Sequence, residues 1–449
     1  MSKIKSIFAY EILDSRGFPT VACTVVTNKG NVGKAKVPSG ASTGEREALE
    51  LRDGDTKRFN GKGVLKAVSN INEIIAPKLI DQEFNVYDQE EIDNFMIKLD
   101  GTDFKKNLGA NATLAVSLAV ADAAAKDKEK PLYRYIKNNI VGDKSKEYVM
   151  PVPMLNVING GAHADNTIDF QEFMIQPISA NSIQEACRIA SECFHSLAKL
   201  LKADGYNTSK GDEGGFAPKL KSAEEALEYM TKAVTAAGYV PGKDITFALD
   251  TACSELYEDG KYTFAKAVKA KFTTPSDGGN VKTTEQMITY LESLVAKFPI
   301  LSIEDGLGEN DREGWAKFME KDGETLQIVG DDLYCTNPNI IADGIKNKWT
   351  NSVLIKLNQI GTLTETIKAI QMSQKNNWTA VVSHRSGETE DTFIADLCVA
   401  LGTGQIKTGS MSRSDRIAKY NRLIEIEHEL GSNATYKGRK SFYSIKEKI

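Results

Sequence analysis

The sequence predicts an α/β fold, in which a C-terminal β/α barrel follows a smaller N-terminal α+β capping domain. Three observations predict it. After residue 150, short apolar runs recur, and each ends in a charged residue and is followed by a helical stretch. Before residue 37, β-rich runs precede a long region of helical pattern. The chain has 449 residues, which is enough for two domains.

The N-terminal domain is expected over residues 1–140. Residues 4–36 alternate β-rich runs with the turns SRG at 15–17 and NKG at 28–30, which is typical of a β-meander. From residue 45 to about 135 the pattern is mostly helical. The loop PSGASTG at 38–44 lies between them, and its small residues suit a mobile lid, although a surface linker has a similar composition.

The C-terminal domain is expected over residues 141–449, because the polar segment VGDKSKE at 141–147 interrupts the helical pattern. Six apolar runs follow, and the charged residues that close them are separated by 54 residues and then by 27, 25, 28 and 23. This spacing is typical of βα units in a barrel. The long first step leaves room for an extra hairpin or insertion near residues 273–280. The closing residues are Asp250, Glu304, Asp331, Lys356, His384 (followed by Arg385) and Lys407.

These strand ends predict a site at the C-terminal mouth of the barrel. Three carboxylates in one mouth repel one another, so a cation is implied, and all-oxygen ligands favour Mg²⁺ over zinc. The lysines, histidine and arginine that follow suit an anion that bears phosphate or carboxylate. A single strand-end acid is more often a solvated or helix-capping residue, but six charged ends on consecutive units are not explained in that way.

Composition excludes several other classes. A net charge of −5 and a pI of about 5.7 argue against general nucleic-acid binding. Six dispersed cysteines indicate reduced core residues and a cytoplasmic protein. The most apolar stretch, residues 110–125, is too short and too polar for membrane insertion and is expected to be a buried helix. No GxxxxGK[ST] phosphate loop occurs.

Several long motifs resemble the enolase family, in its bacterial form. The resemblance extends from DSRG at 14–17 to the region of Glu427, and GAHADN at 161–166 is similar to bacterial rather than animal members. The motifs are GDEGGFAP at 211–218, SIED at 302–305, LIKLNQIGT at 354–362, SHRSGETED at 383–391 and GQIKTG at 404–409. The resemblance implies a glycolytic lyase that reversibly dehydrates 2-phosphoglycerate to phosphoenolpyruvate, with two Mg²⁺ per active site.

The resemblance also implies residue roles. Asp250, Glu304 and Asp331 are expected to bind the first Mg²⁺, and Ser39 of the lid loop the second. Lys356 is expected to be the base that removes the C2 proton, and Glu213, beside Glu172, the acid that protonates the leaving hydroxyl. The pKa of Lys356 would then be depressed and Glu213 would be protonated. The substrate-binding set is expected to be His163, Gln171, Glu172, Glu304, Asp331, Lys356, His384, Arg385, Ser386 and Lys407.

Other interpretations stay open at this point. A sugar-acid dehydratase or racemase of the same superfamily would lack the Ser-His-Arg-Ser loop and the Ser39 lid. A structural role is not supported, because no position expected for catalysis is lost. Plasminogen capture from a cell-surface pool stays open but unsupported, because the C-terminal lysine that often takes part in it is absent from the ending KEKI at 446–449. A homo-oligomer, either a dimer or a ring of dimers, is expected from the resemblance. The polar stretch at 266–280 is longer than the family pattern and has no assigned purpose.

Overall fold

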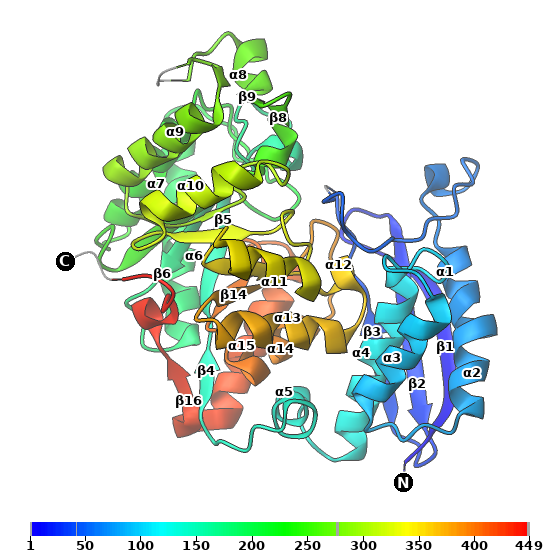
Figure 1. Cartoon of the computed structure of the whole chain (residues 1–449). Helices are drawn as coiled ribbons and strands as arrows, with labels where there is room; N and C mark the ends of the chain where they lie inside the picture. Colours follow the sequence, from blue (N-terminus) through cyan, green and yellow to red (C-terminus); the bar gives the residue numbers. More distant parts are fainter. Residues whose placement is uncertain (1, 42, 275–277, 447–449) are drawn as a thin grey trace.

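The computed structural model describes residues 2–41, 43–274 and 278–446. Figure 1 shows two bodies side by side: a sheet and its helices, coloured blue to cyan, and a larger barrel, coloured green to red. Residues 447–449 of the ending KEKI lie outside the described residues, as does residue 42 of the lid loop.

The expected β-meander is present. Strands β1 (Ile4–Leu13), β2 (Pro19–Thr27) and β3 (Val32–Lys36) pair antiparallel in the order β1-β2-β3. Helix α4 (Ala110–Asp127) packs on this sheet so closely that a Cβ on Gly33 would lie 2.2 Å from the carbonyl oxygen of Ala119. The glycine and the alanines of α4 therefore allow the contact, and the predicted buried helix is confirmed.

The expected helical region begins later than residue 45. Apart from one 3₁₀ turn at Phe59–Gly61, no helix occurs between residues 45 and 64. The backbone of this segment instead forms hydrogen bonds with other elements. Ala48 N–H, for example, donates to the Gln359 carbonyl at 2.8 Å, which connects the N-terminal domain to the barrel. The helices of this domain are α1 (Leu65–Ser69), a π-helical turn (Asn70–Ile75), α2 (Ala76–Asp81), α3 (Gln89–Asp100), α4, α5 (Leu132–Tyr135) and a second π-helical turn (Ile136–Val141).

Eight strands form a closed barrel, two more than the six recognised from their charged ends. The extra pair is β5 and β6, and β6 runs antiparallel to both of its neighbours. A loop without a long helix joins β5 to β6, so the chain returns as a hairpin. The barrel strands are β5 (Val152–Asn159), β6 (Glu172–Pro177), β7 (Ile245–Asp250), β11 (Ile300–Glu304), β12 (Gln327–Gly330), β13 (Ser352–Ile355), β14 (Thr379–Ser383) and β15 (Gln405–Lys407).

Helices surround the barrel, and side chains fill its interior. Met154, Met174 and Val329 belong to the buried cluster inside the strands, so the barrel is a packed core and not a channel. The barrel helices are α6 (Ile183–Ala203), α7 (Ala223–Ala236), α9 (Thr284–Lys297), α10 (Arg312–Asp322), α11 (Pro338–Asn347), α12 (Leu357–Ile360), α13 (Leu363–Lys375), α14 (Phe393–Leu401) and α15 (Ser414–Leu430). A two-stranded parallel sheet, β4 (Tyr148–Met150) with β16 (Ala434–Tyr436), lies outside it.

The insertion after Asp250 is a small unit of its own. It comprises β8 (Tyr257–Glu258), β9 (Lys261–Thr263), α8 (Ala265–Ala270) and β10 (Val281–Lys282), at the top of Figure 1. The hairpin therefore lies at 257–263, earlier than the expected 273–280. Part of that expected segment, residues 275–277, is outside the described residues.

All six cysteines are buried and free, as their dispersed spacing predicted. Within the described ranges, none of the helices combines the length and apolar character needed to cross a bilayer.

Candidate active site

The strand register brings the acidic residues together. Glu304 at the end of β11 lies opposite Asp250 at the end of β7, and Asp250 lies opposite Glu172. Because β6 is antiparallel, its first residue, Glu172, reaches the same mouth as the last residues of its neighbours. Asp331 follows β12 directly. The mouth thus collects four buried carboxylates from four consecutive strands.

Two lysines neutralise part of this charge. Lys407, at the end of β15, places its Nζ 2.9 Å from Asp250, 2.9 Å from Glu304 and 3.0 Å from Glu172. Burial alone would lower the pKa of Lys407, but these carboxylates raise it well above its usual value. Lys356, after β13, is ion-paired with Asp331.

The four carboxylates outnumber the two lysines. Burial, followed by the charge of Asp250, raises the pKa of Glu304 well above its ordinary value, although Lys407 lies 2.9 Å from both of its oxygens. Gln171 donates to Asp250 at 3.2 Å, and its own side-chain oxygen is buried without a partner. Oxygen donors with an unpaired buried acceptor fit a hard divalent cation.

A second acidic group surrounds Asp331. Ligand atoms of Asp305, Asp331 and Asp332 lie within 4.8 Å of one another. The two carboxylate oxygens of Asp305, however, already accept from the backbone N–H groups of Asp331 (2.9 Å) and Asp332 (3.1 Å). Asp305 therefore orients the chain that carries Asp331, a function that its position in the SIED motif did not reveal.

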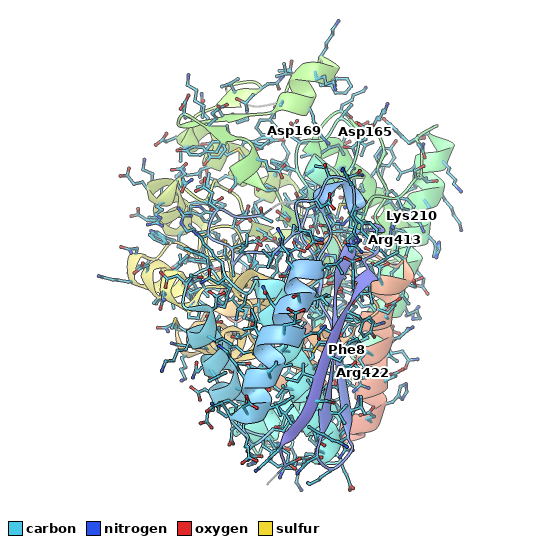
Figure 2. The ribbon with its side chains drawn as sticks, turned by 90° about the vertical axis from the view of Figure 1, so that its right-hand side faces the viewer. Phe8, Asp165, Asp169, Lys210, Arg413 and Arg422 are labelled. Carbon is cyan, nitrogen blue, oxygen red and sulfur yellow. The ribbon has the colours of Figure 1, made fainter. Side chains whose placement is uncertain are left out.

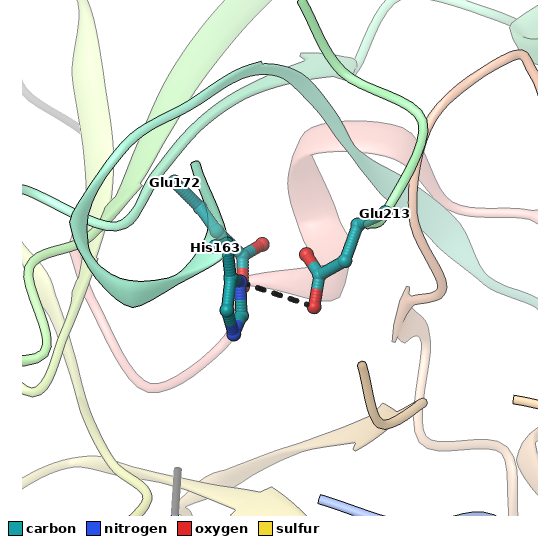
Figure 3. A group of neighbouring side chains, drawn as sticks. All are labelled: His163, Glu172 and Glu213. Atoms are coloured by element: carbon teal, nitrogen blue, oxygen red, sulfur yellow. Dashed lines mark ion pairs between the residues drawn. The ribbon is translucent and has the colours of Figure 1, made fainter. Parts of the chain in front are cut away.

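Next to these strand ends, His163, Glu172 and Glu213 form a tight buried group (Figure 3). His163 Nδ1 lies 3.4 Å from Glu213 and 3.9 Å from Glu172. His384 Nε2 approaches the same Glu213 oxygen at 3.4 Å, and Asn156 donates to the other oxygen at 2.9 Å. Loops after β5 and β14 and the 211–218 motif thus converge on one carboxyl group.

The protonation pattern differs from the expectation. Burial and then the charge of Glu213 raise the pKa of Glu172 well above its usual value. Burial also raises the pKa of Glu213, but His163 and His384 outweigh it and lower that pKa well below the usual value. These surroundings favour the proton on Glu172 and not on Glu213. For Lys356, burial lowers the pKa, but Asp331 outweighs it and raises the pKa above the ordinary value, where a depressed value was expected.

The SHRS loop closes the basic side of the site. Arg385 donates from Nη1 (3.0 Å) and Nη2 (3.1 Å) to the carboxylate of Glu47, which comes from the N-terminal domain. A small pocket is lined by residues of both domains, and it contains most of the expected set. Its lining is Ala41, His163, Gln171, Glu172, Glu213, Lys356, Ser383, His384, Arg385, Ser386 and Lys407.

Ser39 does not line this pocket. Its backbone pairs with Gly387 of the SHRS loop, with N–O distances of 2.7 and 2.9 Å. Its hydroxyl accepts from Arg52 at 2.8 Å and donates to Glu50 at 3.2 Å. Ala41 is the lid residue that reaches the pocket, and Ser42 after it lies outside the described residues.

Sequence reasoning missed the residues that hold the loops. The clearest is Arg416, fully buried at the start of α15, which donates to Nδ1 of His384 and to the carbonyl oxygens of Arg385 and Ser386. Its donation to Nδ1 requires the tautomer of His384 that carries its proton on Nε2, facing Glu213. A lone arginine in a helix start has no spacing that would reveal this role.

Comparison with known proteins matches both parts of the chain. The family description "Enolase, N-terminal domain" matches residues 4–136, and "Enolase, C-terminal TIM barrel domain" matches residues 147–445. The enolase of Malacoplasma penetrans (strain HF-2) is 63% identical over 448 residues, which cover 99% of each chain. The enolase of Mycoplasma pneumoniae is 61% identical over 446 residues, covering 99% of this chain and 97% of that protein, and the enolase of Mycoplasma genitalium is 58% identical over 449 residues, covering 100% and 97%.

Proposed function

The chain belongs to the enolase family, and we propose how its residues carry out the reversible dehydration of 2-phosphoglycerate to phosphoenolpyruvate, the glycolytic lyase reaction of that family. The observation that carries the proposal is that lysines and a histidine-bound glutamate line one pocket. Lys356 and Lys407 contact strand-end carboxylates, and Glu213 lies between two histidines.

The metal proposal rests on the carboxylate ring, defined as the four buried strand-end acids Glu172, Asp250, Glu304 and Asp331. The family uses Mg²⁺, and Glu172 and Asp331 each belong to a cluster that could hold a metal ion, with His163 and Glu213 and with Asp305 and Asp332, respectively. We assign the first Mg²⁺ to Asp250, Glu304 and Asp331, and a second Mg²⁺ to a hydroxyl of the lid loop, with Ser39 as the residue that the resemblance implied. Bound Mg²⁺ would stabilise the negative charge that develops on the substrate carboxylate when the C2 proton leaves.

Lys356 is the proposed base and Glu213 the proposed acid. Lys356 can accept a proton only as the neutral amine, so it must first lose its ion pair with Asp331. Glu213 must receive a proton before it can protonate the departing 3-hydroxyl group of the substrate. Glu172 and His163 are the neighbours that can pass a proton to it. Arg385, Ser386 and His384 are placed for the phosphate, and Lys407 for the substrate carboxylate.

The test separates the two proton transfers. Lys356→Ala should stop both the exchange of the C2 proton with heavy water and the formation of product, because no base remains. Glu213→Gln should stop product formation and leave exchange measurable, because the base and the carboxylate ring are intact. Proton NMR of 2-phosphoglycerate in heavy water measures the exchange, and absorbance measures phosphoenolpyruvate. Each transfer should contribute about 10²- to 10⁴-fold in rate.

The same assay tests the metal. A chelator should abolish exchange and product formation in the wild-type protein, and Mg²⁺ should restore both. Wild-type exchange by Lys356→Ala would show that the base is misassigned, and His163 or His384 would be tested next. Full turnover in metal-free buffer would remove the metal from the reaction.

Three coarser assignments complete the proposal. We place the domain boundary near residue 140, supported by the segment 142–147, which has neither helix nor strand. We propose a cytoplasmic location, supported by six buried free thiols. We also propose a homo-oligomer that associates through the β1 patch, defined as the exposed side chains of Phe8, Tyr10 and Leu13. Exposed apolar side chains that lie close together can form an association surface.

A further inference from the structure

The loop that carries His163 is closed at its base by its own backbone. This His163 loop, residues 160–171, joins β5 to β6. Gly160 N–H donates to the Gln171 carbonyl and Gly161 N–H to the Ile168 carbonyl, both at 2.9 Å. Those bonds fix where the loop leaves the barrel. Nearer the imidazole, His163 N–H donates to the Gly160 carbonyl at 3.0 Å, and Asn166 donates to the carbonyl oxygens of Asn159 and Pro218 at 2.8 and 3.2 Å.

The insertion that follows Asp250 adds contacts on both sides of His163. Lys266, on α8, donates from Nζ to the carbonyl oxygen of Gly161 at 2.5 Å and to that of Ala164 at 2.7 Å. The side-chain oxygen of Asn166 lies 3.4 Å from the same ammonium. An ammonium group has three donor directions, and all three are directed at this loop. The acceptors flank His163 on both sides.

A second contact joins the end of the loop to the same helix. The two carboxylate oxygens of Asp169 accept from the backbone N–H groups of Lys266 at 2.8 Å and of Ala267 at 3.0 Å. Asp165 and Asp169 lie at the end of the molecule that carries the insertion (Figure 2). The loop is therefore attached to α8 both before and after its tip.

The insertion is itself anchored to the barrel, so it can act as a fixed support. Tyr262 of β9 is fully buried, and its hydroxyl donates to Asp311 at 2.7 Å. The ring of Phe264 packs 5.8 Å, between ring centroids, from both Phe170 and Tyr290. Buried aromatic contacts of this kind resist displacement.

We propose that Lys266 is a positioning residue for the dehydration reaction, which fixes the backbone on both sides of His163 and so holds the imidazole against Glu213 and Glu172. The inference rests on the proposed function, because it assumes that His163 works in the active site. It also gives the insertion a purpose: the unit from β8 to β10 carries the ammonium that completes the site.

The first experiment compares three variants in the activity assay. Lys266→Met keeps the length of the side chain and removes its donors, and it should lower kcat/KM by about 10- to 100-fold, the effect of a small misplacement at a reacting group. Lys266→Arg should recover part of the loss, because a guanidinium can donate to the same carbonyl groups. Lys269→Met, an exposed lysine on the same helix, is the matched control and should behave as wild type. Wild-type activity of Lys266→Met would overturn the proposal.

The second experiment asks whether Lys266 acts through His163. If it does, adding Lys266→Met to His163→Ala should change kcat/KM by less than about twofold, because the group to be positioned is already gone. Full multiplication of the two single effects would overturn the proposal, since it would show that Lys266 acts by another route.

The third experiment needs no turnover. The chain has four histidines, so ring signals of the protein labelled with ¹³C-histidine can be assigned by single substitutions. Lys266→Met should shift or broaden the signal of His163 and leave those of His195 and His428 in place. An unmoved His163 signal would overturn the proposal. If His163→Ala is fully active and the His163 signal still moves, the attachment is correct and the assigned role of His163 is wrong.

Discussion

Two lysines of the same mouth have different surroundings, and the difference bears on their roles. Lys407 contacts three carboxylates and is held as a cation on several sides. Lys356 has one ion pair, with Asp331, whose other oxygen accepts from Gln359 at 2.8 Å. Among the described residues, Lys356 has to lose one ion pair to become a free amine, which is consistent with a base. The three carboxylates around Lys407 instead favour its charged form, which is consistent with binding an anion.

The lid serine gives a prediction at the residue scale. Ser39→Ala removes a hydroxyl that is bonded to Arg52 and Glu50, so we expect kcat/KM to fall by about tenfold or more, as for a lost hydrogen bond to charged groups. The measurement is a titration of activity with Mg²⁺, beside Ser42→Ala. A higher Mg²⁺ requirement in Ser39→Ala identifies a ligand, and an unchanged one identifies an anchor of the lid. Wild-type activity would exclude both roles.

The strand-end residues could be predicted from the sequence because a β/α barrel has a regular spacing. Asp250, Glu304 and Asp331 each follow an apolar run, and the fold places such positions at one mouth. The partners could not be predicted in the same way. Arg416 reaches the SHRS loop and Glu47 reaches Arg385 only through tertiary packing, and no local pattern encodes either contact. For the same reason the ion pair of Lys356 with Asp331 and the two histidines beside Glu213, which shift the pKa values of Lys356 and Glu213, were not expected.

At the scale of elements, the sequence predicted the elements whose structure depends on neighbouring residues. The β-meander was predicted from β-rich runs separated by turns, and α4 from a long apolar run rich in alanine. The direction of β6 was not predicted, because it depends on a connecting loop that carries no helical pattern. The segment before Leu65 is irregular although its pattern indicated a helix, since its backbone bonds to both domains, including Leu49 N–H to the Phe104 carbonyl at 2.8 Å.

The junction of α3 and α13 gives a prediction for stability against pH. Asp93 of α3 is fully buried and accepts from the backbone N–H (3.0 Å) and hydroxyl (2.6 Å) of Thr364 at the start of α13. Burial, the largest influence, raises the pKa of Asp93 to about 6. The folded protein thus binds this proton more tightly than the unfolded chain, in which the pKa is about 3.9. The contribution of Asp93 to the free energy of unfolding is therefore greatest below about pH 4 and falls by about 3 kcal/mol as the pH rises through 6.

Asp93→Asn lacks this titration. The thermal midpoint of the wild-type protein, relative to that of the variant, should decrease between pH 4.5 and pH 7. Glu90→Gln, an exposed acid on the same helix, is the matched control and should show no such trend. A difference between wild type and Asp93→Asn that does not depend on pH would contradict the prediction.

At the scale of the whole molecule, the site depends on both domains. The N-terminal domain supplies Glu47 to Arg385, pairs Ser39 with Gly387 and places Ala41 in the pocket. In addition, Lys105 of this domain, nearly fully buried, is ion-paired with Glu365 of α13 at 2.9 Å. The barrel therefore has the strand-end carboxylates on its own but not the closed pocket, which explains why the chain couples the two domains with so many buried polar contacts.

The outer surface of the N-terminal sheet gives the prediction for assembly. Phe8 is 60% exposed, and its ring stacks on that of Tyr10 with 6.0 Å between centroids, while Leu13 is 57% exposed at the end of the strand. Strand β1 pairs only with β2, and Phe8 lies with Arg422 of α15 on the face turned to the viewer in Figure 2. Phe8 and Tyr10, on either side of buried Ala9, thus share one face of the strand, and Leu13 adds exposed apolar surface at its end.

A symmetric dimer places the same patch on both subunits, so one substitution changes the interface twice. We expect wild-type protein to sediment as a dimer or a larger even-numbered assembly, and Phe8→Glu to shift it toward the monomer, because two buried carboxylates would face an apolar partner. Val240→Glu, at a residue that is 52% exposed in the loop before β7, is the matched control and should leave the assembly unchanged. Sedimentation velocity over a range of concentrations measures both. A wild-type monomer would contradict the proposed assembly. A Phe8→Glu variant that stays assembled would place the interface away from the β1 patch, and the barrel surface would then be tested by the same substitution strategy.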